Sequence, residues 1–144
     1  MSSINYPRVI LGGLVAAFIC NVSGITVGGL FLVDEVDAFF DELGRRPASM
    51  QMLFTHVGLR VLLGLACVWL YAAIRPRFGR GPGTAMIAGL ALFAVGYFPL
   101  GLLLLELGLY TLPTTIIALT WSLGEALLMT VAGAALYREP EPGV

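Results

Sequence analysis

Long apolar runs separated by short polar segments make up most of this chain. Four of them approach or exceed the roughly 20 apolar residues that a helix needs to cross the hydrocarbon core of a bilayer. They cover residues 9–33, 52–74, 84–105 and 112–137. Backbone polar groups in lipid must bond within their own segment, which favours helices over open strands. The pattern therefore predicts an all-α fold, an integral membrane four-helix bundle, with 1–144 as a single transmembrane domain.

The segment 34–44, between the first two runs, has a different pattern. Its apolar residues recur at i, i+3, i+4 and i+7, which places them on one face of a short helix. Asp34 is suited to cap this helix and Gly44 to end it. The segment predicts an amphipathic helix lying on the external membrane surface, with a lid over an outward cavity or a docking surface for a partner as alternatives. The apolar face consists of Val36, Phe39, Phe40 and Leu43.

The second and fourth runs resemble each other. GLRVLLGLACVWLY at 58–71 aligns without a gap to GEALLMTVAGAALY at 124–137, and residues 8–14 share a weaker pattern with 84–90. Two spans separate the equivalent positions, so both halves would have the same orientation in the membrane. This predicts a parallel duplication of a helical hairpin.

The composition supports a bilayer as the solvent of this protein. The chain has 144 residues, of which 58% are hydrophobic and 12% charged, and its mean hydropathy is +0.92. Soluble domains carry about 25% charged residues. All eight basic residues are arginines and they form no basic tract, which argues against nucleic acid as a partner.

The arginines between the spans predict the orientation. Arg8 precedes the first span and Arg138 follows the fourth, whereas the loop after the first span is rich in acids. Short arginine-rich loops stay in the cytoplasm, so both termini are expected on the cytoplasmic side and the acidic segment outside. The loop between the second and third spans is expected to contact lipid head groups through Arg75, Arg77 and Arg80.

Two charged residues lie inside the predicted spans. Glu125 lies near the middle of the fourth and Arg60 within the second, and Asn21 is halfway along the first. An isolated charge at the bilayer centre costs roughly 2.5–3.5 kcal/mol on insertion scales, so a partner is expected. We predict one buried polar cluster of Asn21, Arg60 and Glu125, with Arg60 paired to Glu125 through parallel hydrogen bonds.

This cluster leaves three interpretations open. An ion pair that fixes the register of the helices is one. A site for a polar solute or a proton is the second, because intramembrane ionisable residues often mark such sites. Contact with a partner subunit is the third.

Metal, cofactor and catalytic motifs are weak or missing in the sequence. Met50, Met52 and His56 offer soft ligands that suit copper(I), but their spacing matches no established motif. Cys20 and Cys67 form no metal-binding pair and are expected to pack as small apolar residues. We therefore expect no cofactor and assign no catalytic residue.

Three stretches carry a resemblance to a known group of proteins. They are WLYAAIRPRFGRGPGTA at 69–85, and WSLGEALL and ALYRE in and after the fourth run. Here the chain resembles a family of small bacterial four-span integral membrane proteins with no assigned activity, which implies a location in the bacterial inner (plasma) membrane. Members often have an acidic residue after the Asn-x-x-Gly of the first span. In this chain Ile25 follows Asn21-Val-Ser-Gly24, which puts a shared ion site in doubt.

The sequence favours a non-enzymatic structural or assembly subunit of the membrane, forming a homo-oligomer or joining a partner membrane subunit. The first alternative is a small carrier or channel for a polar solute or proton that uses Asn21, Arg60 and Glu125. The second alternative is a membrane enzyme that acts on a lipid-soluble substrate.

Overall fold

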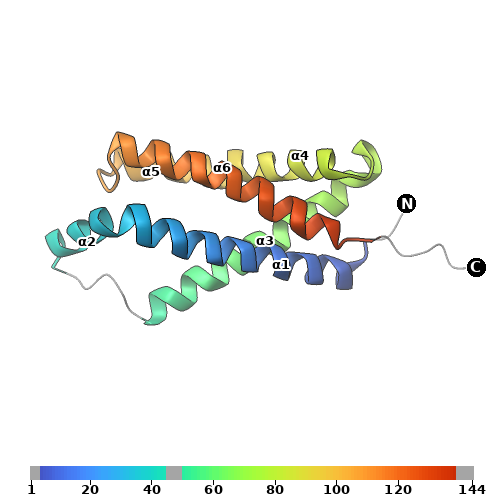
Figure 1. Cartoon of the computed structure of the whole chain (residues 1–144), viewed down its shortest axis with the longest axis horizontal. Helices are drawn as coiled ribbons and strands as arrows, with labels where there is room; N and C mark the ends of the chain where they lie inside the picture. The colour runs from blue at the N-terminus through green and yellow to red at the C-terminus, as the bar shows by residue number, and fades with distance from the viewer. Residues whose placement is uncertain (1–3, 45–49, 139–144) are drawn as a thin grey trace, which may run out of the picture.

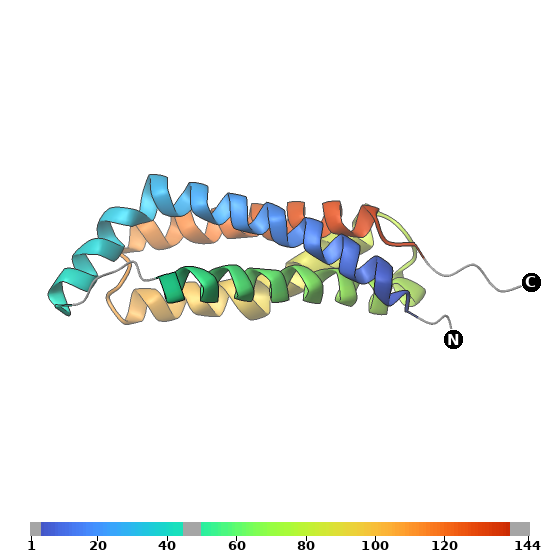
Figure 2. The same cartoon turned by 90° about the horizontal axis from the view of Figure 1, so that it is seen from below.

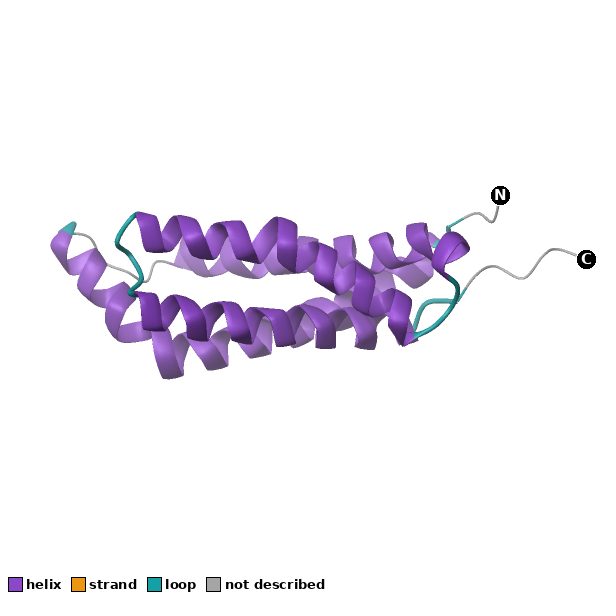
Figure 3. Ribbon diagram, turned by 90° about the horizontal axis from the view of Figure 1, so that it is seen from above, coloured by secondary structure: helices purple, strands orange, loops and turns teal. Residues whose placement is uncertain are grey.

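The computed structural model describes residues 4–44 and 50–138, which fold into a bundle of long helices. Figure 3 shows helices joined by loops, without a strand in the described ranges. The elements are α1 (Tyr6–Val27), η1 (Gly28–Leu32), α2 (Val33–Glu42), α3 (Met50–Phe78), α4 (Pro82–Leu92), η2 (Phe93–Tyr97), α5 (Phe98–Glu106) and α6 (Leu112–Ala135), where η1 and η2 are π-helical.

These elements form four continuous rods that lie side by side (Figure 1). The rods are Tyr6–Glu42, Met50–Phe78, Pro82–Glu106 and Leu112–Ala135, and each is long and apolar enough to cross a membrane. The chain enters and leaves the bundle at the same end (Figure 1). The predicted four-helix bundle is confirmed.

The segment 34–44 differs from its prediction. It is helical, but α2 continues the first rod through η1 instead of forming a separate helix after a loop, and it projects beyond the start of α3 (Figure 2). Asp34 does not cap it, because the helical backbone already runs through Leu32 and Val33. Neither glycine nor proline interrupts the sequence between the apolar run and the acidic one, so nothing ends the helix there. Gly44 does end it, with a positive φ of 63°.

Glu35 joins α2 to the start of α6. One oxygen of its carboxylate accepts hydrogen bonds from the hydroxyls of Thr111 at 3.0 Å and Thr114 at 2.5 Å. The other accepts from the Thr111 backbone N–H at 3.4 Å. Since the N-terminus of a helix carries partial positive charge, a carboxylate is favourable in this place. The acidic segment is thereby held against the fourth rod.

Most of the buried side chains lie in the half of the bundle near the chain ends. No residue of η1, α2 or η2 is buried, and the buried residues of α3 begin at Gly64. Small residues dominate this core, which lets helix backbones approach closely. Its main members are Val9, Ala16, Cys20, Cys67, Val68, Tyr71, Ala72, Ala85, Ala88, Met129, Ala134 and Tyr137.

Glycines of facing helices meet at two crossings of this core. A Cβ on Gly64 of α3 would overlap the Gly13 carbonyl oxygen of α1 and lie 2.6 Å from the Ala17 nitrogen. A Cβ on Gly12 of α1 would overlap the Gly133 carbonyl oxygen of α6. These glycines therefore set the distance of α1 from both of its neighbours.

Tyr71 and Tyr137 occupy matched positions of the proposed duplication, and they touch. Their rings meet edge to face with centroids 6.0 Å apart. Contact between equivalent residues is what a two-fold relation between the two hairpins would produce. The duplication stays a prediction that this contact supports.

Candidate functional site

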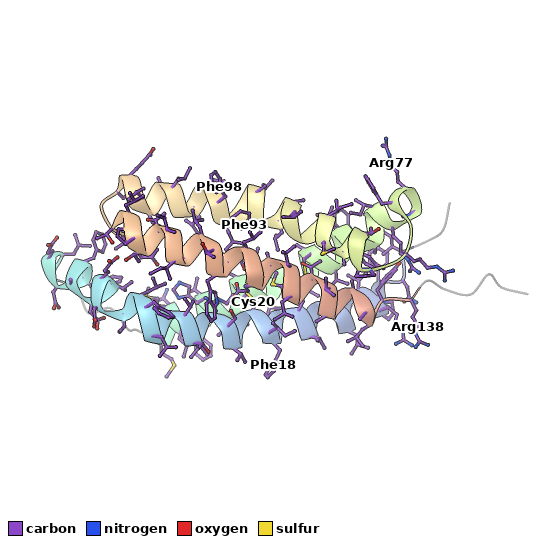
Figure 4. The ribbon with its side chains drawn as sticks, turned by 45° about the horizontal axis from the view of Figure 1, so that its top comes forward. Phe18, Cys20, Arg77, Phe93, Phe98 and Arg138 are labelled. Carbon is purple, nitrogen blue, oxygen red and sulfur yellow. The ribbon has the colours of Figure 1, made fainter. Side chains whose placement is uncertain are left out.

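Glu125 of α6 is buried among side chains from two other rods. Only 8% of its surface is exposed. Its Oε1 accepts a hydrogen bond from the Tyr97 hydroxyl at 2.8 Å and one from the Cys20 thiol at 3.5 Å. Sγ of Cys20 and the Tyr97 hydroxyl also lie 3.5 Å apart. Figure 4 shows Cys20 inside the bundle, near mid-length. Three rods thus meet at one carboxylate oxygen.

Arg60 of α3 binds α1 instead of Glu125. Its Nη1 donates to the backbone carbonyl of Cys20 at 2.9 Å and to that of Asn21 at 3.4 Å. These carbonyls already accept within the helix, so the guanidinium uses their second lone pairs. It lies directly against Gly24, where a Cβ would overlap the guanidinium nitrogens. Gly24 therefore makes room for the arginine.

The structure thus forms only part of the predicted cluster of Asn21, Arg60 and Glu125. The prediction of a direct pair between Arg60 and Glu125 is wrong, because in the described part of the chain no ion pair joins them. Both side chains bind Cys20 instead: Arg60 donates to its carbonyl and Glu125 accepts from its thiol. The reason is that the α1 backbone offers Arg60 two nearby carbonyls. The Asn21 side chain donates to the Ala17 carbonyl of its own helix at 2.9 Å, so it joins the cluster only through its backbone.

Sequence reasoning missed Tyr97 and assigned Cys20 to packing alone. Tyr97 is the last residue of η2 and comes shortly before Pro99. A π-helical turn adds a residue to the helix and changes the direction of every side chain after it, and such turns are frequent at functional sites. An α-helical pattern drawn through this run does not predict which way Tyr97 faces. Its phenol in an otherwise apolar run was the one available signal.

A cavity of about 640 Å³ adjoins Glu125. The Trp121 indole N–H donates to Ser23 Oγ at 2.7 Å, which ties α6 to α1 beside the cavity, and the Phe31 ring lies 6.4 Å from the Trp121 ring. Ile116 and Leu128 are 57% and 61% exposed, so the cavity opens sideways between these rods. It is lined by Ser23, Ile116, Ile117, Thr120, Trp121, Gly124, Glu125 and Leu128.

The three arginines expected at lipid head groups differ in their exposure. Arg77 and Arg80 are exposed, and Figure 4 shows Arg77 at the end of the bundle where Arg138 lies. Arg75 is buried at 7% exposure, and its guanidinium lies 5.3 Å above the Tyr137 ring. The expectation of a head-group contact is therefore wrong for the Arg75 side chain, because Tyr137 offers it a cation–π contact inside the bundle.

The weak metal candidates lie along the first two turns of α3. Met50 and His56 are exposed and Met52 is partly buried. Among the described residues, no group of three or more His, Cys, Asp or Glu side chains is placed to hold a metal ion. Copper binding by these three residues stays a prediction without further support.

The length and apolar character of its four rods make this chain a multi-pass helical membrane protein. Comparisons with protein-family models, curated proteins and solved structures gave no match. The function must therefore be argued from the site itself.

Proposed function

We propose that the protein is a small non-enzymatic carrier in which Glu125 binds and releases a proton. The observation that carries this proposal is a cavity that has a buried mid-span glutamate, Glu125, among its lining residues. Only Oε1 of Glu125 is held by hydrogen bonds from described residues, which leaves Oε2 to accept a proton. Intramembrane carboxylates commonly serve in proton relays.

The proposed location is the bacterial inner membrane with both termini in the cytoplasm. An even number of spans brings the two chain ends to the same side, as in Figure 1. Arg77 and Arg138 lie at that end (Figure 4), whereas the acidic α2 lies at the other. This asymmetry supports the assignment by the positive-inside tendency.

The carrier predicts proton flux that depends on Glu125. Purified protein in vesicles containing a pH-sensitive dye, with an inside-negative potassium diffusion potential imposed, should acidify the lumen faster than empty vesicles. Glu125→Gln keeps the shape of the side chain but cannot ionise, so its flux should fall to the level of empty vesicles. Glu106→Gln, which changes an exposed carboxylate at the end of α5, is the matched control. Flux that Glu125→Gln leaves unchanged would contradict the proposal.

Assembly with a second copy is the alternative that a separate observation favours. In the Gly24-x-x-x-Gly28 pair, Gly24 accommodates Arg60, but a Cβ on Gly28 or Gly29 would meet no atom within 4 Å. Open glycines on a spanning helix suit close packing against another helix. Native mass spectrometry in mild detergent should then show a discrete oligomer that Gly28→Leu disrupts and Gly83→Leu, at an open glycine in the first turn of α4, does not. A monomeric wild-type protein would refute this assembly.

A further inference from the structure

We infer that the cavity beside Glu125 binds a hydrophobic monovalent organic cation that enters from the bilayer. The inference rests on the proposed role of Glu125 and adds to it the chemical class of the second ligand. In this scheme the cation and the proton compete for the same carboxylate.

The charge of the site favours a cation. Oε1 of Glu125 is occupied by Tyr97 and Cys20, whereas no hydrogen bond from the described residues reaches Oε2. The nearby fixed cation, Arg60, is bound to the α1 backbone and does not line the cavity. An ionised Glu125 thus has a free oxygen and no cation in contact with it. In a medium of low dielectric constant, a ligand of opposite charge interacts strongly with such a group.

The walls of the cavity favour an organic and largely apolar ligand. Ile116, Ile117 and Leu128 supply aliphatic surface, and Trp121 supplies an aromatic one. The hydrogen bond to Ser23 holds the indole in place. A tryptophan ring attracts cations, most strongly when they have lost their water. The volume of about 640 Å³ falls within the range of about 300–1,000 Å³ typical of small-molecule sites.

An inorganic cation fits this chemistry less well. Hard metal ions take about six or more oxygen ligands, but the lining residues supply one carboxylate and the hydroxyls of Ser23 and Thr120. The Ser23 hydroxyl already accepts from Trp121. The site therefore has too few oxygens to replace the water around such an ion.

Entry from the bilayer follows from the position of the rim. Ile116 and Leu128 expose more than half of their surface, and on a spanning helix that surface faces hydrocarbon. The cavity thus opens toward lipid, where a hydrophobic cation accumulates. No covalent bond forms between the ligand and the protein. If Glu125 is protonated, its O–H bond breaks as the cation binds: the electron pair stays on the carboxylate and the proton passes to a water molecule.

Tetraphenylphosphonium is a suitable probe, because it is a permanent cation with apolar surface on every side. Calorimetric titration of the purified protein in detergent should show saturable binding of one cation per chain. Binding should weaken by ten-fold or more in Glu125→Gln and stay unchanged in Glu106→Gln. Triphenylphosphine oxide, a neutral molecule of similar shape, should bind at least ten-fold more weakly than the cation.

Acidification should weaken binding, because protons compete for Glu125. The other titratable groups in contact with this carboxylate are Cys20 of α1 and Tyr97 of η2, and the nearest charged group is Arg60 of α3, which binds the Cys20 carbonyl. None of these lines the cavity, so the pH effect should disappear in Glu125→Gln together with the binding. A pH effect that survives this substitution would overturn the assignment of the competing site.

A second variant distinguishes the loss of the binding site from a folding defect in Glu125→Gln. Ile117→Trp fills the cavity and leaves the hydrogen bonds of Glu125 in place, so it should abolish binding in a protein with native helix content. Equal binding of the neutral analogue, or cation binding that survives both substitutions, would overturn the inference.

The outcomes also separate this inference from the proposed function. Cation binding without proton flux would refute the carrier and retain the site. Proton flux without cation binding would retain the carrier and refute the ligand class.

Discussion

Replacing Gly64 with valine is expected to separate α1 from α3 and to lower the stability of the bundle by about 3 kcal/mol, the upper end for overpacking. The new Cβ would overlap the Gly13 carbonyl oxygen and lie 2.6 Å from the Ala17 nitrogen. Both are backbone atoms of a helix, so no side chain can rotate away to make room. The loss should appear as a lower midpoint of thermal unfolding in detergent, followed by circular dichroism.

Gly58→Val is the control for this experiment. It makes the same substitution in the same helix, but a Cβ on Gly58 would meet no atom within 4 Å. The two variants therefore share the change in helix propensity and differ only in the crossing with α1. Equal midpoints in the two variants would show that α1 and α3 do not cross at Gly64.

Exchanging the charges of Arg60 and Glu125 is expected to give no rescue. Arg60→Glu would turn a carboxylate toward the carbonyls of Cys20 and Asn21, which are acceptors like itself. Glu125→Arg would remove the acceptor that Tyr97 and Cys20 use. Each misplaced charge should cost about 3 kcal/mol, as for a charge inserted at mid-membrane. The double variant should lose about the sum of the two.

A double-mutant cycle distinguishes a direct ion pair between Arg60 and Glu125 from two side chains that are bound separately. Unfolding free energies of the wild type, both single variants and the double variant give the coupling between the two side chains. Because both side chains bind Cys20, the structure predicts an indirect coupling at the low end of the range of about 0.5–3 kcal/mol found within one hydrogen-bond network. Stability of the double variant well above that of either single variant would instead show that the two side chains form an ion pair.

The fold was largely predictable because lipid imposes simple rules on a sequence. Spans must be apolar and helical, so the length of the runs located all four rods to within a few residues, except at 34–44. There, a break was expected between an apolar and an acidic stretch. A helix ends where its backbone is interrupted or capped, and a change in polarity does neither.

The polar site was predictable only in outline. The cost of a mid-membrane charge identified Glu125 and Arg60 as residues that need partners, and both have them. The partners themselves were not evident. Arg60 donates to backbone carbonyls, which every residue has and which residue types therefore do not reveal. These carbonyls are accessible because Gly24 has no side chain. Likewise, the buried position of Arg75 depends on the ring of Tyr137, which lies 62 residues later in the chain.

The sequence by itself determined the number of spans, the presence of two intramembrane charges and the location of five of the eight arginines next to the span ends on one side. Each of these follows from the energy of placing a residue type in water or lipid, which depends on that residue and its near neighbours. Only the tertiary structure decided that Tyr97 and Cys20 hold Glu125 and that a cavity opens beside it. Those features depend on where three rods cross and on the π-helical turn that directs Tyr97, and the spacing of apolar residues fixes neither.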